Sequence, residues 1–133
     1  MFIFRKRIYG YECDIYGHLN NADYLPILEA ARSEAMQEMG VSIKKMLEAN
    51  WQIYVLHFEL DYLKALKLEE VIEVHSRILS VNKLKSEWMQ EIYNAEGELC
   101  FTAKMTAVFA HNGKPARLLP EFFEVFARNV ERP

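Results

Sequence analysis

A chain of 133 residues has the commonest length of a single domain, so we expect one domain spanning residues 1–133. Hydrophobic residues make up 51% and charged residues 26%, a balance typical of soluble globular proteins, and the net charge of -3 includes no basic stripe that could hold nucleic acid. No apolar run approaches the roughly 20 residues that cross a bilayer, and no signal peptide is recognisable, so we expect a cytoplasmic protein without a membrane partner.

Two elements are predicted at the N-terminal end. Aromatic and β-branched residues recur in residues 2–12, which predicts a strand that Gly10 bends or ends. From about Asp23 to Met39, apolar and small residues recur at spacings of three and four, which predicts a helix of about five turns that Gly40 stops. The face of this helix consists of Tyr24, Leu28, Ala31, Ala35 and Met39. If Asp23 is the N-cap, Pro26 falls in the first turn of the helix, where a missing N–H is tolerated.

A series of strands follows a short second helix, which Ser42 caps and which runs through Ala49. The residue period then changes from helical to alternating, which predicts four strands, each with one apolar face. Their inner rows are Leu56, Phe58, Leu60 and Tyr62; Ile72, Val74 and Ile78; Leu84, Trp88 and Ile92; and Leu99, Phe101, Ala103, Met105, Ala107 and Phe109. Turns at 82–83 and 95–97 join consecutive strands as antiparallel hairpins.

The chain is predicted to end in a helix that Pro120 opens and that contains Phe122, Phe123 and Phe126. The order of strand, long helix and four-strand meander predicts an α+β fold, in which an antiparallel sheet wraps one helix. One helix covers only part of one face of such a sheet. We therefore expect apolar surface and strand edges that another subunit can bury.

The densest cluster of polar residues lies in the loop before the long helix. Within ten residues it contains Asp14, Gly17, His18, Asn20, Asn21 and Asp23. Helix capping and turn formation explain Gly17, Asn21 and Asp23. They explain Asp14 and His18 less well, because these two lie four apart in a loop aimed at a helix N-terminus, where N–H groups stabilise developing negative charge. The residues alone leave a hydrolytic site and a turn-and-cap structure as alternatives.

The same residues resemble a known family. The run Asp14-x-x-Gly17-His18-x-Asn20-Asn21-x-x-Tyr24-Leu25, followed by Glu29-Ala30-Ala31-Arg32, is similar to the signature of the 4-hydroxybenzoyl-CoA thioesterase family of hot-dog proteins. Residues 61–63, 95–99, 113–115 and 119–120 are also similar, so the likeness covers nearly the whole chain. It implies a long central helix wrapped by a curved antiparallel sheet of about five strands. It also implies a homodimer or a dimer-of-dimers tetramer with sites at the subunit interface.

The resemblance implies hydrolysis of an acyl-CoA substrate without a cofactor. Asp14 matches the catalytic aspartate, which attacks the thioester carbonyl or activates water. Backbone N–H at the start of the long helix polarises the carbonyl oxygen, and Asn21 has the matching position. His18 joins the catalytic loop, chiefly by orienting it, whereas Gly17, Asn20 and Tyr24 are expected to contact substrate. A non-catalytic acyl-CoA binding or sensing module and a hydratase or dehydratase on the same fold are the alternatives.

Other reactive residues have simpler interpretations. Cys13 and Cys100 are far apart and should be reduced thiols; Cys13 is a nucleophile or, since no obvious base is near it in sequence, a small buried filler. His57, His75 and His111 lack metal-ligand spacing, so no metal site is expected. Glu29 and Arg32 form an intrahelical ion pair or have a functional role. Lys83, Lys85, Lys104, Lys114 and Arg117 either hold CoA phosphates or form a charged solvent face.

Overall fold

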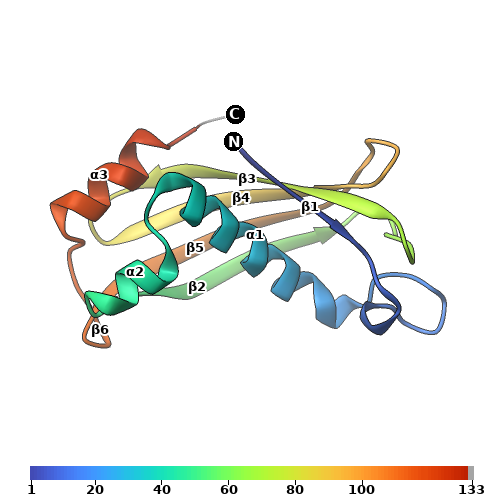
Figure 1. Ribbon diagram of the computed structural model, residues 1–133, viewed down its shortest axis with the longest axis horizontal. Coiled ribbons are helices and arrows are strands. Elements are labelled where there is room, and N and C mark those ends of the chain that lie inside the picture. The colour runs from blue at the N-terminus through green and yellow to red at the C-terminus, as the bar shows by residue number, and fades with distance from the viewer. Residues whose placement is uncertain (132–133) are drawn as a thin grey trace.

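A curled antiparallel sheet with the long helix lying across one face forms the body of the molecule in the computed structural model, which describes residues 1–131 (Figure 1). The elements in chain order are β1 (Phe2–Arg7), the 3-10 turns η1 (Gly10–Glu12) and η2 (Asn21–Asp23), α1 (Tyr24–Met39), α2 (Ile43–Glu48), β2 (Trp51–Tyr62), β3 (Val71–Val81), β4 (Lys85–Tyr93), β5 (Leu99–His111), β6 (Lys114–Pro115) and α3 (Pro120–Arg128). The expected α+β class and hot-dog arrangement are confirmed.

The sheet order is β1-β3-β4-β5-β2, and β6 pairs with the end of β5. The two predicted hairpins connect β3, β4 and β5, but the predicted four-strand meander is wrong at its first strand, because β2 pairs with β5 instead of β3. A hairpin needs a short turn, whereas residues 63–70 cross from the edge strand β2 to β3, which lies next to the other edge strand, β1. Leu66 in this crossing is fully buried, and Glu70 O accepts a hydrogen bond from Ile8 N at 2.9 Å, which anchors the segment beside β1.

Helix α1 has the predicted period. Its buried residues are Tyr24, Ile27, Leu28, Ala31, Ala35 and Met36, whereas Met39 is only partly buried. Gly40 ends the helix with a φ of 86°, a left-handed conformation that costs glycine least. The two halves of α1 pack on separate core clusters, one containing Phe101 and the other containing Phe109 and Phe126. Full burial of each such side chain stabilises the fold by about 1.5–3 kcal/mol, so α1 is held along its length.

Strand β2 differs most from its predicted alternation. Leu56 and Tyr62, both expected on the inner face, are 53% and 52% exposed. A bulge between Val55 and His57 breaks the alternation of the two faces. In the described chain no further strand pairs with the outer side of β2, so it is an edge strand whose apolar side chains stay uncovered.

Smaller corrections concern the other strands. The first strand ends at Arg7, and the residues expected to extend it form the turn η1. Leu84, predicted to be inside, lies in the turn before β4 and is exposed. Gln90 lies in the inner row between Trp88 and Ile92 and is buried, a polar residue that the apolar pattern did not reveal. The predicted cap is confirmed at Ser42, which accepts a hydrogen bond from Lys45 N, and Pro120 opens α3 as predicted, as its first residue.

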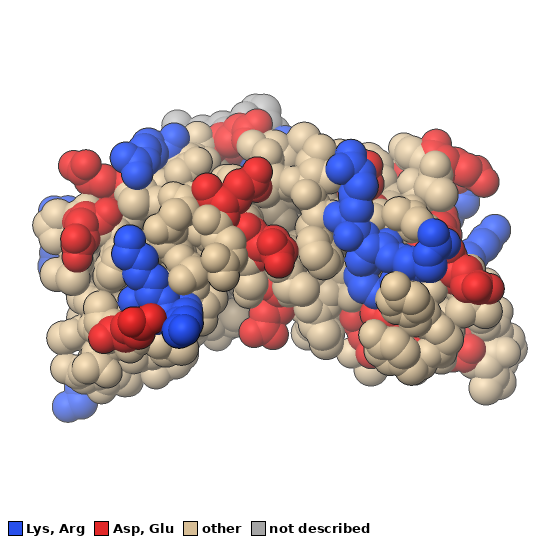
Figure 2. Space-filling view, in the orientation of Figure 1, with Lys and Arg blue, Asp and Glu red and all other residues tan. Residues whose placement is uncertain are grey.

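Acidic and basic side chains are interspersed over the face shown in Figure 2, and the basic group on its right lies beside acidic residues. This distribution fits the low net charge of the chain. Within residues 1–131, no helix combines the length and the apolar character that a membrane-crossing segment requires.

Candidate active site

The loop between η1 and η2 is a compact turn that residues 66–68 hold from the other side. Asp14 N donates to His18 O at 2.9 Å, and Gly17 N donates to Asp14 O at 3.1 Å. Gly17 has a φ of 74°, so this turn needs a residue that adopts positive φ easily. Leu19 N donates to Leu66 O, and Leu68 N donates to Gly17 O. The crossing segment therefore fixes the loop to the core.

The carboxylate of Asp14 is half-buried and oriented by its own loop. Its Oδ1 accepts hydrogen bonds from Tyr16 N at 2.9 Å and from His18 N at 3.2 Å. In the part of the chain that the structure describes, both bonds to this carboxylate end on Oδ1. Oδ2 therefore has no hydrogen bond from the described residues.

Asp14 lies on the wall of an open cleft of about 330 Å³. The cleft is lined by Asp14, His18, Leu19, Asn21, Tyr24, Tyr62, Leu63, Lys64 and Ala65. Four predicted site residues, Asp14, His18, Asn21 and Tyr24, are thus brought together from the loop and the start of α1. Tyr62 and residues 63–65 were not predicted for the site, because they come from the end of β2 and a crossing whose position depends on the sheet order.

Gly17 and Asn20, also predicted to contact substrate, do not line this cleft. Gly17 shapes the turn, and Asn20 caps η2 by accepting a hydrogen bond at Oδ1 from Ala22 N at 3.2 Å. Their contact with substrate stays a prediction. Asp23 precedes α1 as expected, but its side chain makes no capping hydrogen bond, because Asn20 provides the cap one turn earlier.

The start of η2 leaves one backbone donor free. The first N–H groups of a helix have no partner within the helix, and here Ala22 N bonds to Asn20 Oδ1 while Asp23 N bonds to Asn20 O at 2.9 Å. Within residues 1–131 no acceptor takes the N–H of Asn21. This donor belongs to a residue that lines the cleft, so it can receive an anionic oxygen bound there.

Two aromatic residues that line the cleft, Tyr24 and Tyr62, pack against the buried Phe101. The ring of Tyr24 lies 4.5 Å from that of Phe101 and 5.0 Å from that of Tyr62, measured between centroids. Burial, and next the proximity of Tyr62, raise the pKa of Tyr24 to about 12. The phenol is therefore protonated at any physiological pH and can donate a hydrogen bond, as neutral phenols do.

Cys13 and the histidines outside the cleft were the other candidate reactive residues. Burial, and next the charge of Asp14, raise the pKa of the Cys13 thiol, which favours the filler interpretation because the thiolate is the nucleophile. His57 pairs with Glu59 at 3.7 Å and His75 with Glu73 at 2.9 Å. Among the described residues, no three His, Cys, Asp or Glu side chains are grouped in a way that could hold a metal ion.

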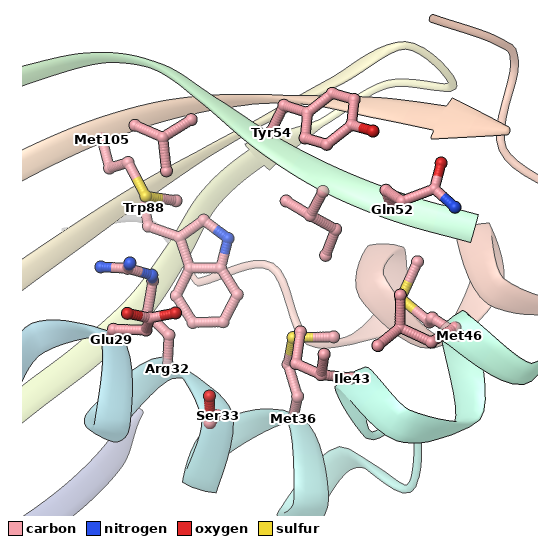
Figure 3. A pocket seen from close by; sticks show the side chains of 13 residues that line it. Glu29, Arg32, Ser33, Met36, Ile43, Met46, Gln52, Tyr54, Trp88 and Met105 are labelled. Atoms are coloured by element: carbon pink, nitrogen blue, oxygen red, sulfur yellow. The ribbon is translucent and has the colours of Figure 1, made fainter. Parts of the chain in front are cut away.

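A second cavity, of about 360 Å³, lies between α1, α2 and the first half of β2 (Figure 3). Methionine and aliphatic side chains dominate its wall, namely Met36, Ile43, Met46, Leu47, Ile53, Val55 and Met105. Glu29, Arg32 and Trp88 also line it, and Figure 3 labels these side chains on the wall of the cavity. The cavity lies farther along α1 than the Asp14 cleft.

Arg32 of α1 is hydrogen-bonded to Gln90, a buried residue of the sheet. It forms no ion pair with Glu29 in the described chain; its Nη1 instead donates to Gln90 Oε1 at 2.9 Å. Gln90 Nε2 donates to Leu28 O at 3.0 Å and to Ser76 Oγ at 2.9 Å. A buried polar group must be hydrogen-bonded, and this network satisfies Gln90 while it ties α1 to β3 and β4. A glutamine within an apolar inner row is the sequence signal that could have predicted it.

The basic residues considered for CoA phosphates lie mostly at the far end of the sheet. Tyr62 at the cleft pairs with Phe101, whereas Lys114 pairs with His111 at the other end of β5, about 30 Å along the strand. Lys83 is tied to the same end, because its carbonyl accepts a hydrogen bond from Leu118 N. Lys104 pairs with Glu87 at 3.6 Å. Within one chain, therefore, these cations do not surround the cleft.

Comparison with known proteins gives a family match over most of the chain. Residues 10–130 match the model of a family described as the thioesterase-like superfamily. The chain is 28% identical over 92 residues to the long-chain acyl-CoA thioesterase FadM of Escherichia coli strain K12, covering 69% of this chain and 68% of the relative. It is 24% identical over 108 residues to the acyl-CoA thioester hydrolase YbgC of Escherichia coli O6:H1, covering 81% of each.

A solved structure supports the architecture. A hypothetical protein from Aquifex aeolicus superimposes with a TM-score of 0.90 and 25% identity, covering 95% of this chain and 99% of the other. The curled sheet and its helix are therefore shared over nearly their full length.

Proposed function

The chain belongs to the thioesterase-like superfamily, and we propose that it hydrolyses an acyl-CoA thioester to the free acid and CoA. The observation that carries the proposal is the carboxylate of Asp14, which its loop orients through two hydrogen bonds to Oδ1 and which belongs to a residue that lines the cleft at the start of the long helix. The named relatives FadM and YbgC, an acyl-CoA thioesterase and an acyl-CoA thioester hydrolase, support the choice of substrate.

A thioester is an activated acyl donor, so one carboxylate and an oxyanion site can suffice for hydrolysis. Asp14 Oδ2 either attacks the carbonyl carbon directly, forming an anhydride that water opens, or takes a proton from the attacking water. In both routes the C–S bond breaks and CoA leaves as the thiol after protonation. The unbonded N–H of Asn21 donates a hydrogen bond to the carbonyl oxygen and so stabilises the negative charge that develops there.

The other cleft residues position the reactants. His18 holds Asp14 through its backbone on both sides, since its N–H binds the carboxylate and its C=O accepts the Asp14 N–H. The neutral phenol of Tyr24 provides a hydrogen-bond donor beside an apolar wall, which suits an acyl group or the thioester itself. This mechanism requires no metal or cofactor.

A homodimer, or a dimer of such dimers, forms the second part of the proposal. Exposed edge strands pair readily with a second chain, and the edge of β2 carries exposed Tyr54, Val55 and Leu56. Antiparallel pairing of β2 with its copy would place the start of the partner's β2 beside the end of this β2. The partner's basic end would then lie near the Asp14 cleft, where Lys83, Lys114 or Arg117 could reach CoA phosphates. A cytoplasmic location also stays a prediction.

The test is hydrolysis itself. Purified protein is incubated with short-chain, long-chain and aromatic acyl-CoAs, and released CoA is measured with a thiol reagent. We expect turnover with at least one of them. Binding of these acyl-CoAs without release of CoA would instead favour the sensing module, and hydration of an enoyl-CoA without release of CoA would favour the hydratase.

A further inference from the structure

An ion pair with a buried carboxylate and a partly buried ammonium lies beside the Asp14 loop and takes no part in the proposed chemistry. Glu12 is only 5% exposed, although it lies two residues before Asp14. Lys6 Nζ donates to its two carboxylate oxygens at 2.6 and 2.7 Å. Lys6 is itself held, because Nζ also donates to Arg7 O at 2.7 Å and lies 5.3 Å from the centroid of the Tyr9 ring.

Glu12 is connected to both ends of the loop. Its Oε1 accepts a hydrogen bond from Tyr9 N at 2.8 Å, which fixes the turn η1 through which the chain enters the loop. Its carbonyl oxygen accepts a hydrogen bond from Asn20 N at 2.8 Å, where the chain leaves the loop. Asn20 in turn caps η2, whose first residue is Asn21. One residue therefore links strand β1, the Asp14 loop and the start of the long helix.

Such a pair is costly as a device for stability alone. Removing a lysine and a glutamate from water carries a desolvation penalty that their attraction barely offsets, and apolar replacements of similar size are often as stable or more stable. Precise geometry, by contrast, is valuable at this position. A displacement of about 1 Å between reacting groups can reduce turnover about 10²-fold.

We infer that the Lys6–Glu12 pair is a positioning device for hydrolysis: it holds the loop so that the Asp14 carboxylate and the Asn21 N–H face the same point of the cleft. The inference rests on the proposed function and adds two positioning residues to it. Neither residue lines the cleft, so both act through Asp14 and Asn21.

Two variants separate positioning from stability. Glu12→Gln keeps the size of the side chain and an acceptor for Tyr9 N, but places an amide against the Lys6 ammonium. Lys6→Met/Glu12→Leu replaces the pair by apolar side chains and removes the bond to Tyr9 N. The matched control is Glu91→Gln, which breaks the half-buried Arg77–Glu91 pair on the other face of the sheet, away from the loop.

Steady-state kinetics and melting temperature are measured for each variant. We expect kcat to fall about tenfold or more in both loop variants, with KM within about threefold, because transition-state geometry is lost and ground-state binding is kept. The double variant should keep a wild-type melting temperature and still be slow. A double variant with wild-type stability and wild-type kcat would overturn the inference, and so would an equal loss of kcat in Glu91→Gln.

A double-mutant comparison and hydrogen exchange complete the test. In an Asp14→Asn background, Glu12→Gln should reduce the residual rate by less than about twofold, because residues acting through one group are not additive. Independently of catalysis, the N–H groups of Asp14 and Asn20 should exchange faster in both loop variants, while β4 amides stay unchanged. If the wild-type protein hydrolyses no acyl-CoA, the proposed function fails, and these exchange rates alone decide the positioning role.

Discussion

The backbone N–H of His18 donates a hydrogen bond of 3.2 Å to Oδ1 of Asp14. The reverse connection, from Asp14 N to His18 O at 2.9 Å, closes the same turn. Two residues predicted for catalysis are thus joined by two hydrogen bonds of the His18 backbone, and we propose that His18 orients Asp14 without using its imidazole.

His18→Ala keeps both backbone bonds and should therefore reduce kcat by less than about tenfold, well below the 10²- to 10⁴-fold that a general acid or base contributes. The measurement is kcat against pH for wild type and variant. The two profiles should have the same shape. If a limb of the wild-type profile disappears in the variant, proton transfer by the imidazole replaces the orienting role.

The oxyanion donor can be tested at Asn21. Asn21→Pro removes the backbone N–H and should cost about 10²-fold in kcat, as loss of one oxyanion donor typically does. Asn21→Ala keeps the N–H and should cost far less, so the two variants separate backbone from side chain. The comparison is made on proline variants that bind a non-hydrolysable acyl-CoA analogue normally. Normal binding together with wild-type turnover in Asn21→Pro would place the polarising donor elsewhere.

The β2 edge predicts a dimer in dilute solution. Light scattering at micromolar concentration should give twice the mass of one chain or, for a dimer of dimers, four times that mass. Leu56→Lys introduces a charge at the exposed edge and should shift the protein towards monomer, since lysine on an edge strand opposes pairing. Leu84→Lys, at an exposed leucine in the turn before β4, is the control and should leave the mass unchanged. A monomeric wild type would refute the interface.

The raised pKa of Cys13 predicts a slow thiol. Because the thiolate is the reactive form, a pKa above the ordinary value leaves less thiolate at a given pH, and the reaction with iodoacetamide accelerates only at higher pH. Alkylation of Cys13 is followed by peptide mass spectrometry, which separates it from Cys100. Half-maximal reactivity should occur at higher pH in the native protein than in the urea-unfolded chain. The opposite order would make Cys13 an activated nucleophile.

The features that the sequence predicted correctly are those that local physics controls. The spacing of three and four predicted α1, and Gly40 predicted its end. Ser42 predicted the cap of α2, and Pro120 predicted the first residue of α3. The position of β2 was not predictable in this way, because alternation shows which side chains share a face and carries no information on which strands pair. The contacts of Glu12 were missed for a different reason. Lys6 and Tyr9 meet Glu12 only because the chain turns at η1, where a continuing strand was predicted.

At the candidate site, the sequence located the loop and its residue types but not the far wall. Asp14, His18 and Asn21 are close in sequence, so one loop brings them together. Tyr62 and Ala65 arrive from the end of β2 and the crossing that follows it, and their place depends on sheet order. Gln90 was missed because its partners Arg32, Leu28 and Ser76 lie on other elements.

The most direct test is the turnover of Asp14→Asn with an acyl-CoA that the wild type hydrolyses. Asparagine keeps an oxygen that can accept the hydrogen bonds from Tyr16 N and His18 N, so the loop should keep its shape and only the reactive carboxylate is lost. With melting temperature and CoA binding unchanged, we predict a fall in kcat of about 10²-fold or more. A folded Asp14→Asn protein that releases CoA within about threefold of the wild-type rate would contradict the assignment of Asp14 as the catalytic carboxylate.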